Sequence, residues 1–170
     1  DVAVRRYLAA NGVDAAATTV AVGQNQLVFD NVRLGPKAAP DLTARRILID
    51  LKWSAFSLLI AGVHLDGATL KMRADAGDVS FGSLDRLIPP DRSTRFPALR
   101  VDASDAAIAV LTPAGTIDVR VDAAGRLDRD FHATGRTTVV ALRWANCSAT
   151  LPEARFTIKT AAQDFAVAGS

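Results

Sequence analysis

Apolar and polar residues alternate along most of the chain, and the segment 45–53 shows this pattern most clearly. Every second residue from Ile47 to Trp53 is apolar, while Asp50 and Lys52 occupy positions between them. A period of two places successive side chains on opposite faces of a β-strand. The segment therefore predicts a strand with one buried face and one wet face.

The strand pattern breaks directly after this segment. Phe56, Leu59 and Ile60 are spaced to share one helical face, and Gly62 follows just past the last of them. Ser54 is a residue type that caps helix N-termini, and glycine often follows a helix C-terminus. We therefore expect one or two helical turns that link two strands.

Strand character resumes after this link. Apolar residues alternate at 63–65 and again at 70–72, and Asp66 and Gly67 give a turn or bulge signal between them. A third short strand is expected at 79–81. The whole region 45–81 therefore predicts a succession of strands with one helical interruption.

Two further short helices are expected. The residues 84–88 form a helical face that Pro89 and Pro90 must end, because proline cannot continue a helix. At the other end, 2–11 has an amphipathic pattern followed by Gly12, a natural C-terminal cap.

Short segments of alternating residues, separated by turn signals, cover the rest of the chain. The further strand candidates are 15–22, 26–34, 98–103, 106–112, 116–123, 126–134, 136–144, 147–151, 155–160 and 163–168. No long helix separates consecutive strands, so no parallel crossover is needed and the sheet is expected to be antiparallel. The fold class is therefore mainly β: one long, curved antiparallel sheet, a β-groove, with a short N-terminal helix and one or two short helical links.

The domain organisation expected is one segment over residues 1–170. Its parts are a capping helix at 1–12, a first repeat-like unit at 15–88 and a continuing antiparallel meander at 98–170.

One face of this sheet is apolar and must be covered. It can be covered by a second sheet in a closed sandwich, by closure into a barrel, or by another apolar body such as lipid chains in an open trough. The residues expected to line that face are Ile49, Leu51, Val63, Leu65, Leu70, Met72, Leu99, Val101, Ile108, Val110, Ile117, Val119 and Val121. The same residues could instead pack together in a dry core.

Composition narrows the function classes. With 49% hydrophobic residues and a formal charge of +2 over 170 residues, the chain is expected to fold and has no charge run suited to nucleic acid. Only 6% of residues are aromatic, so stacking platforms for bases are also not expected. No apolar run reaches the 18 residues of a membrane span, and Asp1 is not an initiator Met, so the chain is expected to be part of a longer protein.

Candidate chemistry is sparse. His64 and His132 lie in no catalytic motif, and the single Cys147 allows neither a disulfide nor a cysteine zinc site. Acidic residues near 66–78 are expected to serve turns and not calcium. We therefore expect no enzymatic activity, no cofactor and no metal.

Several motifs of the first half resemble a known family. They are RRYLAANGV at 5–13, LVFDNVRLG at 27–35, and the series Leu58, Leu59, Gly62, Val63, Leu65, Gly67, Leu70, Phe81, Gly82, Leu84 and Asp85. In order and spacing these resemble the N-terminal repeat of the AsmA-like superfamily, and the YdbH-type branch in particular. Beyond about residue 90 the likeness is one of architecture only.

This resemblance implies a function. AsmA-like proteins are similar to the eukaryotic bridge-like lipid-transfer proteins, whose long β-grooves conduct phospholipid between membranes without a chemical step. It implies phospholipid as ligand, and a periplasmic protein anchored to the inner membrane by a helix upstream of this sequence. An envelope protein partner is also possible under this likeness, while nucleic acid is not expected. The alternatives are a closed β-sandwich that binds another protein in the cell envelope, and an accessory to small-solute transport.

Overall fold

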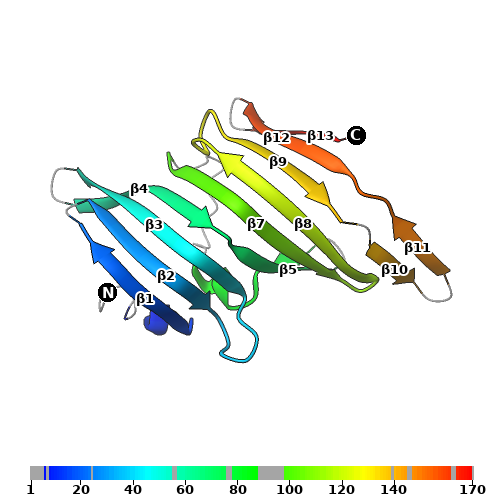
Figure 1. Cartoon of the computed structure of the whole chain (residues 1–170), viewed down its shortest axis with the longest axis horizontal. Coiled ribbons are helices and arrows are strands. Elements are labelled where there is room, and N and C mark those ends of the chain that lie inside the picture. Colours follow the sequence, from blue (N-terminus) through cyan, green and yellow to red (C-terminus); the bar gives the residue numbers. More distant parts are fainter. Residues whose placement is uncertain are drawn as a thin grey trace.

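A computed structural model describes residues 6, 8–23, 25–54, 57–75, 78–87, 98–138, 140–144, 147–161 and 164–169. Over these residues the protein is mainly β, with one large sheet and short helical pieces, which confirms the expected fold class (Figure 1). The elements are β1 (Ala15–Val22), β2 (Gln26–Leu34), β3 (Leu42–Ser54), β4 (Ser57–Asp66), β5 (Thr69–Asp75), β6 (Asp78–Ser80), η1 (Gly82–Leu87), β7 (Arg100–Thr112), β8 (Gly115–Ala124), β9 (His132–Thr137), β10 (Val140–Trp144), β11 (Cys147–Leu151), β12 (Arg155–Ala161) and β13 (Asp164–Gly169).

The large sheet of the described chain contains eleven strands. Its neighbours follow the order β1-β2-β3-β4-β7-β8-β9-β12-β13, and β5 lies between β3 and β7 with β6 at its side. The strands β10 and β11 form a separate hairpin. Figure 1 shows these strands side by side in one extended layer.

The expectation of a wholly antiparallel sheet is wrong at one place. The strands β4 and β5 both pair with β7 in parallel, while the other pairs in the sheet are antiparallel. In the chain, β5, β6 and η1 lie between β4 and β7. The strand β7 then runs in the same direction as β4 and β5. The sequence did not indicate this parallel pairing, because such pairing is usually reached through a long helix, whereas β6 and η1 are the described elements of this connection.

The strands β4 and β5 act as one bent strand. Residues 62–66 of β4 pair with 100–104 of β7, and residues 69–73 of β5 pair with 107–111 of the same strand. Between them, Gly67 N–H donates to the Ser104 carbonyl at 3.0 Å, and Ala107 N–H donates to the Ala68 carbonyl at 2.7 Å. The signal at Asp66 and Gly67 is therefore a bulge and not a hairpin turn.

The helical link expected at 54–60 is also wrong. Ser57–Asp66 is a strand, and within it Leu58, Leu59 and Ile60 pair with Trp53, Lys52 and Leu51 of β3. The adjacent β3 offers these residues a full set of hydrogen-bonding partners, and this tertiary pairing overrides a helical spacing of only a few residues.

Three later boundaries also differ from the expectation. The strands expected at 98–103 and 106–112 are one strand, β7, with a bulge at Ser104 and Asp105. The strand expected at 126–134 is instead a turn followed by β9, because the Asp130 carboxylate accepts the Arg126 N–H at 2.7 Å and closes a local loop. The strand expected at 136–144 is divided between β9 and β10.

A line of backbone irregularities, which we call the crease, crosses the sheet. Asn31, Gly67 and Asp105 have positive φ angles of 52°, 56° and 51°. Arg45 of β3 lies between them, and its guanidinium donates to Asp66 Oδ1 at 2.9 Å and Asp105 Oδ2 at 3.1 Å. Glycine adopts this positive φ at residue 67 at little cost, and a Cβ there would displace the Arg45 side chain from its present position.

Four of the six buried apolar residues of the described chain gather along this crease. Phe29, Val32, Ala44 and Ala68 are 5–7% exposed and form one cluster. Partly buried residues from both sides of the crease, among them Leu65 and Ala106, pack against that cluster. The register shifts thus let small and large apolar side chains meet on one face where the sheet bends.

The N-terminal helix expected at 2–11 lies largely outside the described residues, but its end is described. Gly12 has a φ of 68°, its N–H donates to the Ala9 carbonyl at 2.9 Å, and the Val13 N–H donates to the Leu8 carbonyl at 2.9 Å. This is a glycine-capped helix end. The Arg86 guanidinium of η1 donates to the Gly12 carbonyl at 2.9 Å and ties the two helical pieces together.

Candidate functional site: the apolar face of the sheet

Strand register brings the expected lining residues onto one face of the sheet. On one side of the crease, Ile49 of β3 pairs with Val63 of β4, which pairs with Val101 of β7. Leu51 and Leu65 continue this face at alternate positions of their strands. These side chains therefore form a first apolar row across three strands.

A second apolar group lies beyond the crease. Leu70 of β5 pairs with Ile108 of β7, which pairs with Val119 of β8, and Met72, Val110 and Ile117 form the next row in the same way. Val121 pairs with Ala106. Since Ala106 and Leu65 pack against the same buried cluster, both groups share one face, which we call the apolar face. Leu99 stands just before β7 and is placed outside the strands.

The apolar face is only partly covered. All thirteen expected lining residues are half-buried, and none is fully buried. The buried apolar residues of the described chain are Val13, Phe29, Val32, Ala44, Ala68 and Ala133. In the described part of the chain, the elements touch chiefly as neighbours along the sheet, and the only second sheet is the β10–β11 hairpin.

The surface area of the chain agrees with a single open layer. The accessible surface is 11360 Å², whereas a compact protein of 17.9 kDa is expected to expose about 8,000 Å². The excess, on the order of 3,000 Å², is more than a standard protein interface buries in total.

Large apolar side chains extend beyond the half-buried rows at one end. Trp53, two residues after Leu51 in β3, is 69% exposed, and Ile60, which pairs with Leu51 from β4, is 56% exposed. Contiguous exposed apolar surface of this kind marks a place where another apolar body binds.

The opposite face of the sheet is polar and contains an aspartate-histidine cluster. His64 Nε2 lies 2.7 Å from Asp50 Oδ2, and His64 Nδ1 lies 3.0 Å from Asp102 Oδ2. The Nε2 contact is a hydrogen bond, and the Nδ1 contact brings a second carboxylate to the same ring. The cluster therefore joins β3, β4 and β7 through one side chain.

Neighbouring groups set the charge of Asp102. Partial burial by itself raises the pKa of Asp102. Hydrogen bonds from Arg100 Nε at 2.7 Å and from the Gly125 N–H lower this pKa, as do the charges of Arg100 and His64. These effects outweigh burial, so the pKa of Asp102 lies below its ordinary value. Asp102 is therefore ionised at neutral pH and holds the His64 ring in place.

No group of three or more metal-ligating side chains occurs within the residues that the structure describes. Across those same residues, no helix has the length and apolar character needed to cross a membrane. Sequence reasoning placed His64 in a strand but did not pair it with Asp50 and Asp102. That grouping depends on which strands are neighbours, and no local signal contains it.

Comparison with known proteins adds no assignment: no protein-family model, no curated protein and no solved structure matches this chain. The fold and the apolar face therefore define the class by themselves. The chain is a mainly β protein with one open, mixed sheet that is apolar on one face and charged on the other.

Proposed function

We propose that the apolar face binds the acyl chains of phospholipid, and that the protein is a non-enzymatic conduit segment of the AsmA-like, YdbH type. The observation that supports this most is the continuous row of half-buried aliphatic side chains on a single sheet layer. Acyl chains are held by apolar area, at about 25 cal/mol per Å² removed from water, and need no polar constellation. Head groups would stay in water at the margin of the sheet.

The cellular setting rests on the resemblance of the first half of the chain. Under that likeness the segment belongs to a periplasmic protein anchored to the inner membrane, and phospholipid passes along the groove between the two membranes. An envelope protein that supplies or receives lipid would be the natural macromolecular partner.

Native mass spectrometry of the purified chain, followed by solvent extraction and lipid analysis, tests the proposal directly. We expect co-purified phospholipid, and uptake of added fluorescent phospholipid by chain that has been stripped of lipid. A folded, ligand-free monomer that takes up none would overturn the proposal and favour a protein as the body that covers the apolar face.

Trp53 allows the site to be located. It lies on the apolar face and is largely exposed, so phospholipid with brominated acyl chains should quench its fluorescence in a Trp144→Phe variant, in which it is the remaining tryptophan. Quenching by brominated acyl chains but not by a water-soluble bromide at equal bromine concentration is expected. Equal quenching by both would place the lipid elsewhere.

A further inference from the structure

Three arginines stand in register on the polar face. Arg120 of β8 pairs with Arg136 of β9, and Arg136 pairs with Arg155 of β12, so neighbouring strands place the three side chains side by side. All three are exposed. Adjacent strands are about 4.8 Å apart, and like charges directly opposite one another destabilise a sheet. We call this set the arginine row.

The arginines of the row contact no carboxylate within the described residues, unlike several other arginines of the described chain. Four arginines elsewhere in the described chain each contact a carboxylate: Arg45, Arg46, Arg100 and Arg126. No carboxylate contacts Arg120, Arg136 or Arg155 within the described residues, although Asp118 and Asp122 flank Arg120 two positions away on the same strand. Within the described residues, the row therefore places three positive charges side by side without a direct ion pair.

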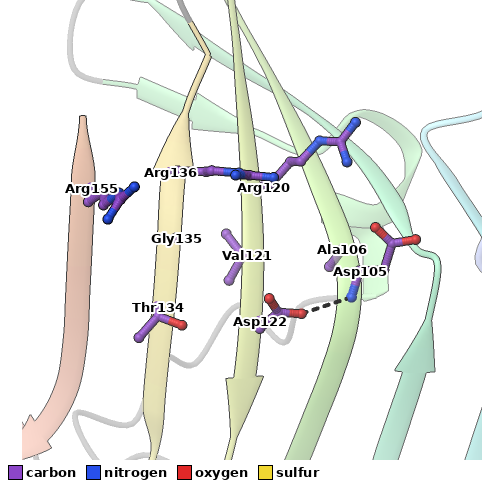
Figure 2. A pocket seen from close by; sticks show the side chains of 9 residues that line it. All are labelled: Asp105, Ala106, Arg120, Val121, Asp122, Thr134, Gly135, Arg136 and Arg155. Atoms are coloured by element: carbon purple, nitrogen blue, oxygen red, sulfur yellow. Dashed lines mark hydrogen bonds between the residues drawn. The ribbon is translucent and has the colours of Figure 1, made fainter. Parts of the chain in front are cut away.

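A shallow depression of about 320 Å³ lies at the arginine row (Figure 2). Besides the arginines, it is lined by Asp105, Ala106, Val121, Asp122, Thr134 and Gly135. In Figure 2 the arginines occupy one side of the depression, with Thr134 and Asp122 across from them. The volume lies at the small end of the range of ligand sites, which suits a compact group.

The two carboxylates that border this depression already have donors. Asp122 Oδ1 accepts the Asp105 backbone N–H at 2.9 Å, which is the dashed line in Figure 2. Asp105 Oδ2 accepts from Arg45 Nη2 at 3.1 Å. These carboxylates therefore hold the crease together, and the guanidinium groups of the row are left to bind a ligand.

We propose that the arginine row binds a phosphate group. Each guanidinium offers a planar fork of N–H donors that matches phosphate oxygens, and the long side chains of three adjacent strands can reach one anion that presents oxygens in several directions and carries more than one charge. A carboxylate offers only two oxygens in one plane and one charge, so it would leave part of the row unpaired. Thr134 adds a hydroxyl on the other side of the depression.

This site lies on the opposite face from the aliphatic rows, because the exposed positions 118, 120 and 122 of β8 alternate with the half-buried Val119 and Val121. It therefore does not depend on the proposed acyl-chain binding. The phosphate can belong to a small soluble anion or to the head group of a lipid in a membrane surface, and the two sources are separated by experiment.

The test measures binding of inorganic phosphate by calorimetry, and binding of vesicles by sedimentation. Two kinds of vesicle are compared: phosphatidylcholine alone, and phosphatidylcholine with one fifth phosphatidic acid. Arg136→Gln removes the central guanidinium, Arg136→Lys keeps the charge but not the fork, and Arg33→Gln is the matched control because Arg33 is exposed on the distant β2. We expect Arg136→Gln to weaken binding at least ten-fold, Arg136→Lys to be intermediate, and Arg33→Gln to change it less than two-fold.

The outcomes separate cleanly. Loss of inorganic phosphate binding in Arg136→Gln identifies a soluble anion, and loss confined to vesicles with phosphatidic acid identifies a lipid head group. Equal binding by wild type and Arg136→Gln, or equal weakening in Arg33→Gln, would overturn the proposal. Fluorescent phospholipid uptake by the apolar face should be unchanged in Arg136→Gln, so failure here is distinct from failure of the conduit proposal.

A stability measurement provides an independent readout. Without ligand, Arg136→Gln relieves repulsion in the row and should raise the melting temperature, whereas phosphate should raise the melting temperature of wild type but not of the variant. A lower melting temperature of the ligand-free variant would show that the row is a structural feature and would count against the proposal.

Discussion

Replacing Val119 by aspartate is the sharpest test of the apolar face. Val119 lies in β8, half-buried, between Ile108 of β7 and Thr137 of β9. Thr116→Asp is the matched control, since Thr116 is a β-branched residue of the same strand that is exposed on the polar face. Each variant adds one negative charge to β8, and only the face differs.

The expected magnitudes follow from the burial of Val119. Full burial of a valine side chain is worth about 1.5–3 kcal/mol, and the protein covers most of the Val119 side chain, so losing that burial should cost about 1–2 kcal/mol of unfolding free energy. For lipid binding, the part that stays exposed contributes about 0.5 kcal/mol of contact with an acyl chain, and covering a carboxylate with that chain costs at least about 2 kcal/mol. The sum of at least about 2.5 kcal/mol corresponds to roughly 100-fold weaker binding.

Titration with a fluorescent phospholipid, with circular dichroism as the test of folding, measures both effects. Val119→Asp should remain folded and bind roughly 100-fold more weakly, while Thr116→Asp should bind as wild type does. If folded Val119→Asp binds lipid within three-fold of wild type, the apolar face is not where acyl chains lie, and the reasoning from half-buried rows is refuted.

Three further variants test the packing and charge of the sheet. A Cβ at Gly135 would collide with the ring of Phe156 on the paired strand. Gly135→Val should therefore displace the ring and lower the unfolding free energy by about 1–3 kcal/mol, which chemical denaturation can measure. An unchanged unfolding free energy would contradict this contact. His64→Leu leaves the carboxylates of Asp50 and Asp102 without their shared partner and should lower the unfolding free energy by about 1 kcal/mol, as chemical denaturation can measure. An unchanged unfolding free energy would show that this cluster does not hold the three strands together. The pKa of Asp102 is lowered in the folded protein, so its contribution to the unfolding free energy is present above the ordinary aspartate pKa and is lost as pH falls through the lowered value. Asp102→Asn should therefore reduce the drop of the denaturation midpoint in acid. An unchanged drop would exclude Asp102 as a source of the acid sensitivity.

Much of the local structure could be predicted from the sequence. The strands expected at 15–22, 26–34 and 147–151 have those bounds in the structure. The alternation of β8 also predicts correctly that Val119 and Val121 point away from the charged face. A period of two is a local property of the chain, and it survives in whatever sheet the strand enters.

Errors occurred where a local signal competes with pairing. The helical spacing after Trp53 gave way to β4 because β3 supplies a hydrogen-bonding edge. The turn signal at Ser104 and Asp105 became a bulge because β7 continues between β4–β5 on one side and β8 on the other. In both cases the neighbouring strands, and not the residues themselves, chose between two allowed conformations.

By itself, the sequence determined that the chain is mainly β and that thirteen aliphatic and sulfur-containing side chains belong to one apolar set, because both follow from residue alternation. Only the tertiary structure decided that β4 and β5 run parallel to β7, that this set stays half-buried on an open layer, and that Arg120, Arg136 and Arg155 stand side by side. The physical reason is that register between strands far apart in the chain is set by the whole sheet, and a local pattern determines only which face a side chain takes and not which neighbour it meets.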